Sequence, residues 1–327
     1  MPRVTSADVA RLSGVSRTTV SYVLNGTAGT SNSEATRRRV LDAAAELGYA
    51  PSAAARTLRS GRSDLVLCVL PDWPVGPVVE TMLDHLADEL AVRGLSVLVH
   101  HVRGERPLAE LWRAVTPRTV VGLTPFSPDE VQAMRRAGIQ VVDTDAGDPD
   151  AEDPQPRIGR IQVERLTAGG RTRLGYAATS DRRVAEFADR RLAGARAACA
   201  ELGLAEPLVI AVDVDAESGV AAVDAWRAAG VDGIAAYNDE VAFAVLAGAR
   251  IAGLAVPGDL AVIGVDDVPL AALAAPPLTT ITQSIDREAA HLAARVLAAL
   301  DGMDPPPHPQ VGPTLVVRES ALSLIHI

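Results

Sequence analysis

Residues 14–26 read GVSRTTVSYVLNG, and this stretch decides the architecture of the N-terminal part of the chain. Gly14 is the residue type that tolerates a left-handed turn between two helices. Ser16 is a favourable N-cap, so a helix is predicted over 17–24, and Asn25 with Gly26 ends it. The buried stripe of this helix is predicted to consist of Val20, Val23 and Leu24.

Similar signals predict a helix on each side of this stretch. Thr5 and Asp8 have the spacing of a capping box and open a first helix. A second capping box at 31–34 opens a third helix, which runs through Leu47 and is closed by Gly48. The side chains predicted to be buried are Val9, Ala10 and Leu12 of the first helix and Val40, Leu41, Ala44 and Leu47 of the third. Three short helices with a glycine turn before the second form a helix-turn-helix unit.

The second helix of such a unit enters the major groove of DNA, where its N-terminal side chains meet base edges. Arg17 has the geometry to donate two hydrogen bonds to a guanine. The residues predicted to lie in the major groove are Ser16, Arg17, Thr18, Ser21 and Tyr22. Those predicted at the DNA backbone are Thr5, Asn25 and Thr36. The alternative is a small helical bundle with a solvated, charged face.

Charge is distributed unevenly along the 327 residues. The net charge of −10 by itself argues against a nucleic-acid partner. Residues 1–62, however, hold nine Arg against four acidic residues, so this part is at +5 and the remainder at −15. A basic head on an acidic body is the electrostatic pattern of a DNA-reading module joined to a sensor domain.

Composition restricts the other classes of protein. Apolar residues make up 48% and charged residues 22%, which is typical of a globular chain of two or three domains. No run of eighteen apolar residues occurs, and residues 1–8 lack the apolar core of a signal peptide, so a cytoplasmic, nucleoid-associated protein is expected. Cys68 and Cys199 are isolated and are predicted to be buried thiols. His100 and His101 are predicted to end an exposed strand, and no metal is expected.

From Leu65 onward, short apolar runs alternate with amphipathic stretches. The predicted strands are 65–70, 95–99, 119–123, 139–142, 174–177, 208–212, 233–236 and 260–265. The predicted helices include 78–93, 184–202 and 240–252, and 148–156 is predicted to be an acidic, Pro-rich loop. This alternation predicts doubly wound parallel sheets, whose ligands bind beyond the C-terminal ends of the strands. No Gly-x-Gly-x-x-Gly or P-loop follows a strand, so no nucleotide cofactor is expected.

Five segments of the N-terminal part resemble the signature of the LacI/GalR family. They are VT at 4–5, DVA at 8–10, GVSRTTVSYVLNG at 14–26, TRRRV at 36–40 and AELGYAP at 45–51. Tyr22 stands where the family more usually has Arg. The resemblance implies a transcriptional regulator, expected to be a repressor, that binds a pseudo-palindromic DNA operator as a homodimer.

Residues 51–58, PSAAARTL, resemble the hinge helix of the same family. Eight residues are too few to hold a helix alone, so the segment is expected to form one only against DNA and its dimer mate. The resemblance implies that Leu58 wedges between base pairs in the minor groove. The predicted hinge contacts are Ser52, Ala55, Arg56 and Leu58. The alternative is a flexible, Ala-rich linker.

The C-terminal part resembles the sensor domain of this family, which has the two-lobed, type I periplasmic-binding-protein fold. The matching segments are RLAG at 191–194, YND at 237–239, VPGDLAVIGVDD at 256–267, PPLTTI at 276–281 with Gln283, and LVVRES at 315–320. The resemblance implies that Arg191, Asn238 and Asp266 line the effector cleft. A donor fork, an amide and a carboxylate suit a sugar or a similar polar metabolite.

Three further residues follow predicted strands of the first lobe. Asp72, Trp73 and Phe126 are predicted to close over the ligand, with the aromatic rings stacking on a sugar face. The alternatives are that the aromatic rings only pack, and that Asp266 and Arg191 form a salt bridge between the lobes.

The predicted domains are a headpiece, a hinge, two lobes and a tail. The headpiece comprises 1–50 and the hinge 51–62. The N-terminal lobe comprises 63–160 with 282–309, and the C-terminal lobe 161–281 with 310–321. The tail, 322–327, fits no element and is interpreted as an artefact.

Two other functions compete with regulation. A sugar receptor without DNA function would not need the headpiece, and an enzyme would need a nucleophile and a base, which none of the six His is placed to supply. No catalytic activity is expected.

Overall fold

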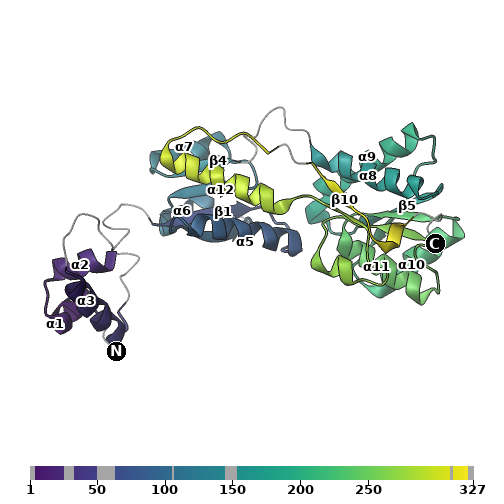
Figure 1. Cartoon of the computed structure of the whole chain (residues 1–327). Helices are drawn as coiled ribbons and strands as arrows, with labels where there is room; N and C mark the ends of the chain where they lie inside the picture. Colours follow the sequence, from purple (N-terminus) through teal and green to yellow (C-terminus); the bar gives the residue numbers. More distant parts are fainter. Residues whose placement is uncertain are drawn as a thin grey trace. The chain divides into compact units, whose positions relative to one another are not determined.

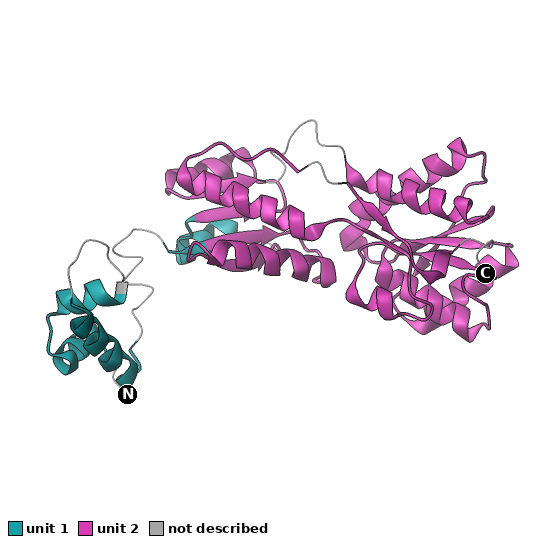
Figure 2. Ribbon diagram, viewed as in Figure 1, with its two compact units in different colours: residues 1–65, 107–118 teal, residues 66–106, 119–327 magenta. Residues whose placement is uncertain are grey.

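The computed structural model describes residues 4–25, 33–49, 63–104, 107–143, 153–309 and 312–322. The chain divides into two compact units, residues 1–65 with 107–118 and residues 66–106 with 119–327 (Figure 2). The hinge residues Ser52, Ala55, Arg56 and Leu58 lie outside the described residues, as does all of the tail except Leu322. Within the described ranges, no helix is long and apolar enough to span a membrane.

The first unit contains the three predicted short helices. They are α1 (Ser6–Ser13), α2 (Arg17–Asn25) and α3 (Glu34–Glu46), and α6 (Leu108–Val115) also belongs to this unit. The buried core of the short helices consists of Val9, Ala10, Val20, Val40, Ala43 and Ala44. Gly14 has the left-handed conformation expected between α1 and α2, with φ at +68°.

Two of the side chains predicted to be buried in this core are exposed. Leu12 is 47% exposed and Leu41 is 43% exposed. In α1 the buried position is taken by Ser13, whose hydroxyl is satisfied by donating to the Val9 carbonyl at 2.6 Å. In α3, Val40 and Ala44 define the inward face, and Leu41 is rotated away from it.

The helix caps agree with the sequence at two of three places. The Thr5 hydroxyl donates to the Asp8 carboxylate at 2.7 Å, and the Ser16 hydroxyl accepts from the Thr19 amide at 3.1 Å. The third prediction is wrong in position, because Ser33 is the N-cap of α3 and Glu34 is already helical. A serine next to the first helical residue satisfies a free amide directly, so no capping box over 31–34 is needed.

The first sheet of the second unit has the strand order β2-β1-β3-β4. Its strands are β1 (Leu65–Leu70), β2 (Ser96–His101), β3 (Thr119–Gly122) and β4 (Gln140–Asp143). Its helices are α5 (Pro77–Ala91), α7 (Pro128–Arg136) and, from far along the chain, α12 (Ile285–Asp301) (Figure 1). Leu292, Ala293 and Val296 of α12 share a buried core with the sheet, so α12 belongs to this first lobe.

The second sheet is parallel in all its described pairs and has the order β6-β5-β7-β8. Its strands are β5 (Leu174–Thr179), β6 (Leu208–Val212), β7 (Gly233–Ala236) and β8 (Ala261–Ile263). The helices α8 (Pro154–Ala168) and α9 (Ala185–Glu201) cover one face, and α10 (Ala216–Ala228) and α11 (Asp239–Ile251) cover the other (Figure 1). This sheet and its four helices form the second lobe.

Short elements complete the second unit. They are the 3₁₀ turns η1 (Arg182–Val184), η2 (Pro269–Leu273) and η3 (Glu319–Ala321), and the antiparallel pair β9 (Thr280–Thr282) and β10 (Thr314–Val316). Thr279 forms a bridge with Ile263 at the end of β8, and α12 begins directly after β9. The chain therefore crosses from the second lobe to the first at about residue 283.

The acidic, Pro-rich segment was predicted to be a loop through residue 156, but α8 already begins at Pro154. The Asp153 side chain caps the helix by accepting from the Gln155 amide at 3.0 Å. Proline is tolerated in the first turn of a helix because the amides there have no intrahelical acceptor. The predicted boundary between the lobes at 160/161 falls inside α8, which packs on α9 of the second lobe.

Glycines let α8 and α9 approach closely. A Cβ at Gly194 would lie 1.9 Å from the Pro156 carbonyl oxygen, and one at Gly159 would lie 2.0 Å from the Arg191 carbonyl oxygen. The first turn of α8 is therefore held against the turn of α9 that carries Arg191.

We expect Gly194→Ala to lower the free energy of unfolding by about 3 kcal/mol, since the added methyl group forces two helix backbones apart. Ala193→Ser, at the exposed neighbouring position, is the matched control and should cost less than about 1 kcal/mol. Denaturant unfolding measures both. Equal stability of the two variants would contradict the close packing described here.

Candidate functional site

The exposed surface of α2 presents the side chains predicted to contact DNA. Arg17, Thr18 and Tyr22 are exposed, and Ser21 is half-buried. Arg17 is exposed on α2 and makes no side-chain hydrogen bond or ion pair with another residue that the structure describes. DNA contact by these side chains remains a prediction.

Three other predicted DNA contacts have structural partners. The hydroxyls of Ser16 and Thr36 bond to Thr19 and Ser33, at 2.9 and 3.0 Å, and Thr5 bonds to Asp8. Thr5 and Ser16 belong to helix caps and Thr36 bonds to the N-cap residue of α3, although each hydroxyl retains acceptor capacity. The side chain of Asn25 lies outside the described residues.

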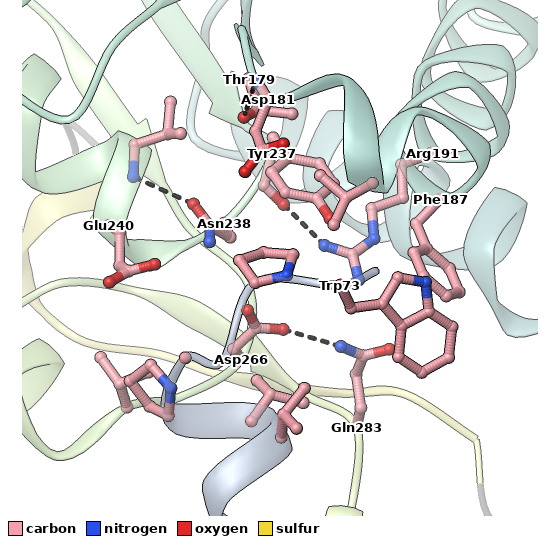
Figure 3. A pocket seen from close by; sticks show the side chains of 18 of the residues that line it. Trp73, Thr179, Asp181, Phe187, Arg191, Tyr237, Asn238, Glu240, Asp266 and Gln283 are labelled. Atoms are coloured by element: carbon pink, nitrogen blue, oxygen red, sulfur yellow. Dashed lines mark hydrogen bonds between the residues drawn. The ribbon is translucent and has the colours of Figure 1, made fainter. Parts of the chain in front are cut away.

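A pocket of about 330 Å³ lies between the two lobes of the second unit (Figure 3). It lies beyond the C-terminal ends of β1, β5, β7 and β8, which is where ligands of doubly wound sheets bind. The first lobe contributes Trp73, Pro74, Gly76, Pro77, Val78, Val79 and Met82. The second lobe and the crossing segment contribute Gln155, Thr179, Asp181, Val184, Phe187, Arg191, Val214, Tyr237, Asn238, Glu240, Val241, Asp266, Val268, Gln283 and Ile285.

Four of the six residues predicted to contact an effector line this pocket. They are Trp73, Arg191, Asn238 and Asp266. Asp72 does not line it, because its carboxylate accepts from Arg103 Nε at 2.7 Å in a half-exposed ion pair. Phe126 does not line it either, because its ring occupies the space that the missing side chain of Gly122 leaves free. We therefore remove Asp72 and Phe126 from the candidate site.

Several polar and aromatic residues of the pocket were not predicted from the sequence. They are Gln155, Thr179, Asp181, Phe187, Tyr237, Glu240 and Gln283. Tyr237 and Gln283 could have been predicted, because both belong to segments that resemble the family. Gln155 had no such signal, since it lies in a stretch predicted to be a loop.

Arg191 is the most buried charged residue of the pocket, at 5% exposure. Its Nε donates to Gln155 Oε1 at 2.6 Å, and its Nη1 donates to the Tyr237 carbonyl at 2.7 Å. Its guanidinium carbon also lies 4.8 Å from the centre of the Tyr237 ring. The second terminal nitrogen has no partner among the described residues and is free to bind a ligand oxygen (Figure 3).

Asp266 follows β8 in an unusual backbone conformation, with φ at +109°. Its carboxylate accepts from Gln283 Nε2 at 2.7 Å. Burial raises the pKa of Asp266 to about 6, although Arg191 and Gln283 favour the charged form. In the described part of the chain Arg191 and Asp266 form no direct ion pair, which disfavours the alternative of a salt bridge between them; two glutamines lie between the two side chains.

The remaining polar and aromatic groups have distinct positions. Asn238 caps α11, accepting from the Val241 amide at 3.0 Å, which leaves its NH₂ group available. Trp73 and Phe187 form an edge-to-face pair with centroids 5.2 Å apart, one ring from each lobe. The pocket thus offers polar groups beside an aromatic wall.

Behind the pocket wall, Asp239 is fully buried. Its carboxylate accepts from the Thr280 hydroxyl at 2.6 Å and from the Val268 amide at 2.9 Å. Burial raises its pKa to about 7, even though both hydrogen bonds favour ionisation. Asp239 therefore fixes the loop that carries Asp266 to β9.

Because the folded chain keeps the Asp239 proton to a higher pH than the unfolded chain, stability should fall as pH rises from about 4 to about 7. Asp239→Asn keeps one acceptor oxygen for the Val268 amide but cannot titrate, so we expect its stability to fall less with rising pH, by a slope smaller by up to about 1.4 kcal/mol per pH unit. Denaturant unfolding at pH 5, 6 and 7 measures both slopes. Parallel curves would exclude Asp239 as the titrating group.

Comparison with known proteins agrees with this division into a helix-turn-helix headpiece and a two-lobed domain. Residues 5–52 match the bacterial regulatory proteins of the lacI family, and residues 163–321 match a periplasmic binding protein-like domain. The chain is 31% identical to the HTH-type transcriptional regulator CelR of Thermobifida fusca, over 97% of this chain and 98% of CelR. It is also 31% identical to the regulator GntR of Pseudomonas aeruginosa, over 98% and 93% of the two chains.

Solved structures show the same fold. A complex of the transcriptional regulator CelR with cellobiose has a TM-score of 0.64 and 29% identity, covering 97% of this chain and all of that one. A lac repressor dimer bound to operator and the anti-inducer ONPF has a TM-score of 0.77 and 24% identity, covering 98% and 100%.

A helix-turn-helix headpiece and a two-lobed domain with a pocket between the lobes together define a DNA-binding transcriptional regulator with a periplasmic-binding-protein-like domain. The chain belongs to the LacI family of these regulators. Members of this family are regulators and not enzymes, which disfavours both competing functions considered from the sequence.

Proposed function

We propose that this protein is a repressor that binds a pseudo-palindromic operator as a homodimer and responds to a small effector in the interlobe pocket. The observation that carries the effector proposal is the juxtaposition of Arg191, Asn238 and Asp266 with the aromatic pair of Trp73 and Phe187. Operator binding would associate the protein with the nucleoid.

The effector we propose is an uncharged, polyhydroxylated molecule, such as a mono- or disaccharide. Hydroxyl groups can donate to Asp266 and accept from Arg191 and Asn238, while a sugar face packs on an aromatic ring. Among the described residues that line the pocket, the charged ones are the carboxylates of Asp181, Glu240 and Asp266 and the cation of Arg191. This balance disfavours phosphorylated and carboxylated sugars. The cellobiose complex of the related CelR also supports a neutral sugar.

The DNA contacts we propose are made by Ser16, Arg17, Thr18, Ser21 and Tyr22 in the major groove and by Thr5, Asn25 and Thr36 at the backbone. Ser52, Ala55, Arg56 and Leu58 are proposed to act in the minor groove. Dimeric binding places two headpieces on half-sites about one DNA turn apart. An effector that changes the angle between the lobes would change whether both headpieces fit. To move the bound fraction from 99% to 1%, it needs about 5.5 kcal/mol of differential affinity.

Selection of bound sequences from a random DNA library tests operator binding. We expect an enriched, roughly palindromic site for the full-length protein at low salt, with affinity that falls steeply as salt is raised. No enrichment would contradict the proposal.

With the selected site, Arg17→Ala should weaken binding by about 1–3 kcal/mol and relax the preference for one base pair in each half-site. Arg135→Ala, which removes an exposed arginine from α7, is the matched control and should leave affinity unchanged. Fluorescence anisotropy titration measures both. Wild-type affinity in the Arg17 variant would exclude Arg17 from base recognition.

A panel of neutral mono- and disaccharides that includes cellobiose tests the pocket by calorimetry. For the sugar that binds best, we expect Trp73→Ala to weaken binding about tenfold, because the apolar face loses its aromatic partner. Phe126→Leu, outside the pocket, should change affinity less than twofold. Tighter binding of phosphorylated or carboxylated sugars would contradict the charge argument.

A further inference from the structure

Three hydrogen bonds run in one direction across the pocket floor. Arg191 Nε donates to Gln155 Oε1 at 2.6 Å, Gln155 Nε2 donates to Gln283 Oε1 at 3.4 Å, and Gln283 Nε2 donates to Asp266 Oδ1 at 2.7 Å. A guanidinium can only donate and an ionised carboxylate can only accept, so the two charged ends orient both amides between them. We call these four side chains the glutamine relay.

The members of the relay belong to different parts of the second unit. Arg191 is on α9, Gln155 is on the first turn of α8, and Asp266 follows β8, so these three are carried by the second lobe. Gln283 lies between β9 and α12, where the chain crosses to the first lobe. The hydrogen bonds of Gln283 therefore tie the crossing segment to the wall of the second lobe.

The backbone that follows Gln283 leads directly into a helix of the first lobe. Ser284 has a left-handed conformation, with φ at +54°, and α12 begins at the next residue. From there, α12 packs into the core of the first lobe through Leu292 and Val296. A displacement of Gln283 would therefore move the start of α12, and α12 is packed into the core of the first lobe.

The two ends of the relay are also the groups proposed to bind the effector. Asp266 uses its Oδ1 to hold Gln283, and a ligand hydroxyl that donates to this same oxygen competes with the amide of Gln283. The 3.4 Å bond between the glutamines is the longest of the three, so Gln155 alone holds Gln283 weakly. A ligand that takes Oδ1 of Asp266 and the hydrogen bond that holds Gln283 are then alternatives, and ligand binding favours the state without that bond.

We propose that the glutamine relay is an interlobe latch: in the unliganded protein it holds Gln283 on the second lobe, and a ligand that binds Asp266 releases it. The latch rests on the effector function proposed above and specifies how that site is regulated. Gln283 acts here as a positioning residue for the lobes. Its effect must therefore be visible when no ligand is present.

The test compares full-length wild type, Gln283→Met, Gln155→Met, the double variant that combines these two changes, and the control Gln132→Met, which alters an exposed glutamine of α7. Methionine keeps the length of the side chain and removes its amide. Without ligand, Gln283→Met should change affinity for the selected operator by about three- to tenfold, in the direction in which the bound sugar changes that of wild type. Gln155→Met should shift it less, and the double variant no more than Gln283→Met alone, since both act through one relay.

Small-angle scattering of the same unliganded proteins gives a second readout that needs neither DNA nor sugar. We expect Gln283→Met to alter the interatomic distance distribution and Gln132→Met to match wild type. If wild type enriches no DNA site, the proposed function fails, and scattering alone still decides whether the latch exists.

One result would overturn the latch: Gln283→Met alters sugar affinity but leaves the scattering of the unliganded protein unchanged and its operator affinity within twofold of wild type. Gln283 would then be a simple ligand contact. Thermal unfolding checks that each variant is folded. If Gln283→Met does not fold, Gln283→Glu replaces it, because a second carboxylate beside Asp266 repels it at the same side-chain length.

Discussion

The pocket of the second unit is arranged around a buried cation, the guanidinium of Arg191. A buried charge is costly unless hydrogen bonds replace its water. Gln155 and the Tyr237 carbonyl supply those bonds, and the Tyr237 ring adds a cation–π contact. Gln155 reaches Arg191 only because Gly194 lets α8 approach α9. The helix packing and the chemistry of the pocket are therefore parts of one arrangement.

The opposite wall of the pocket is organised around carboxylates. Asp239, buried behind the wall, holds the Val268 amide and the Thr280 hydroxyl, and so fixes the loop that carries Asp266. Asp267 in the same loop pairs with Arg318 at 2.7 Å, next to the end of β10. The loop is thus anchored to β9 through Asp239 and, through Asp267, to a residue two positions beyond the end of β10.

The sequence predicted the order of strands and helices well, because strands such as β1 and β7 are short, contiguous apolar runs. The prediction failed where two neighbouring side chains could each fill the core. Leu12 is exposed, and Ser13 is buried in its place because its hydroxyl donates to the Val9 carbonyl of the same helix. The prediction also failed at Phe126, because no local pattern reveals that Gly122 leaves room for a ring. Gln155 lies near Arg191 only through tertiary packing, so residue type and spacing alone could not place it in the pocket. Phe187 precedes Arg191 by four residues on α9, so the helix predicted over 184–202 already put both on one face, and this signal was overlooked.

The central claim is that the interlobe pocket and the DNA-reading headpiece are energetically coupled. The most direct test measures operator affinity with and without the best-binding sugar, and sugar affinity with and without operator. Linkage requires the two ratios to be equal, and we expect a common factor of about five or more. A sugar that binds the pocket tightly and leaves operator affinity unchanged would contradict the account.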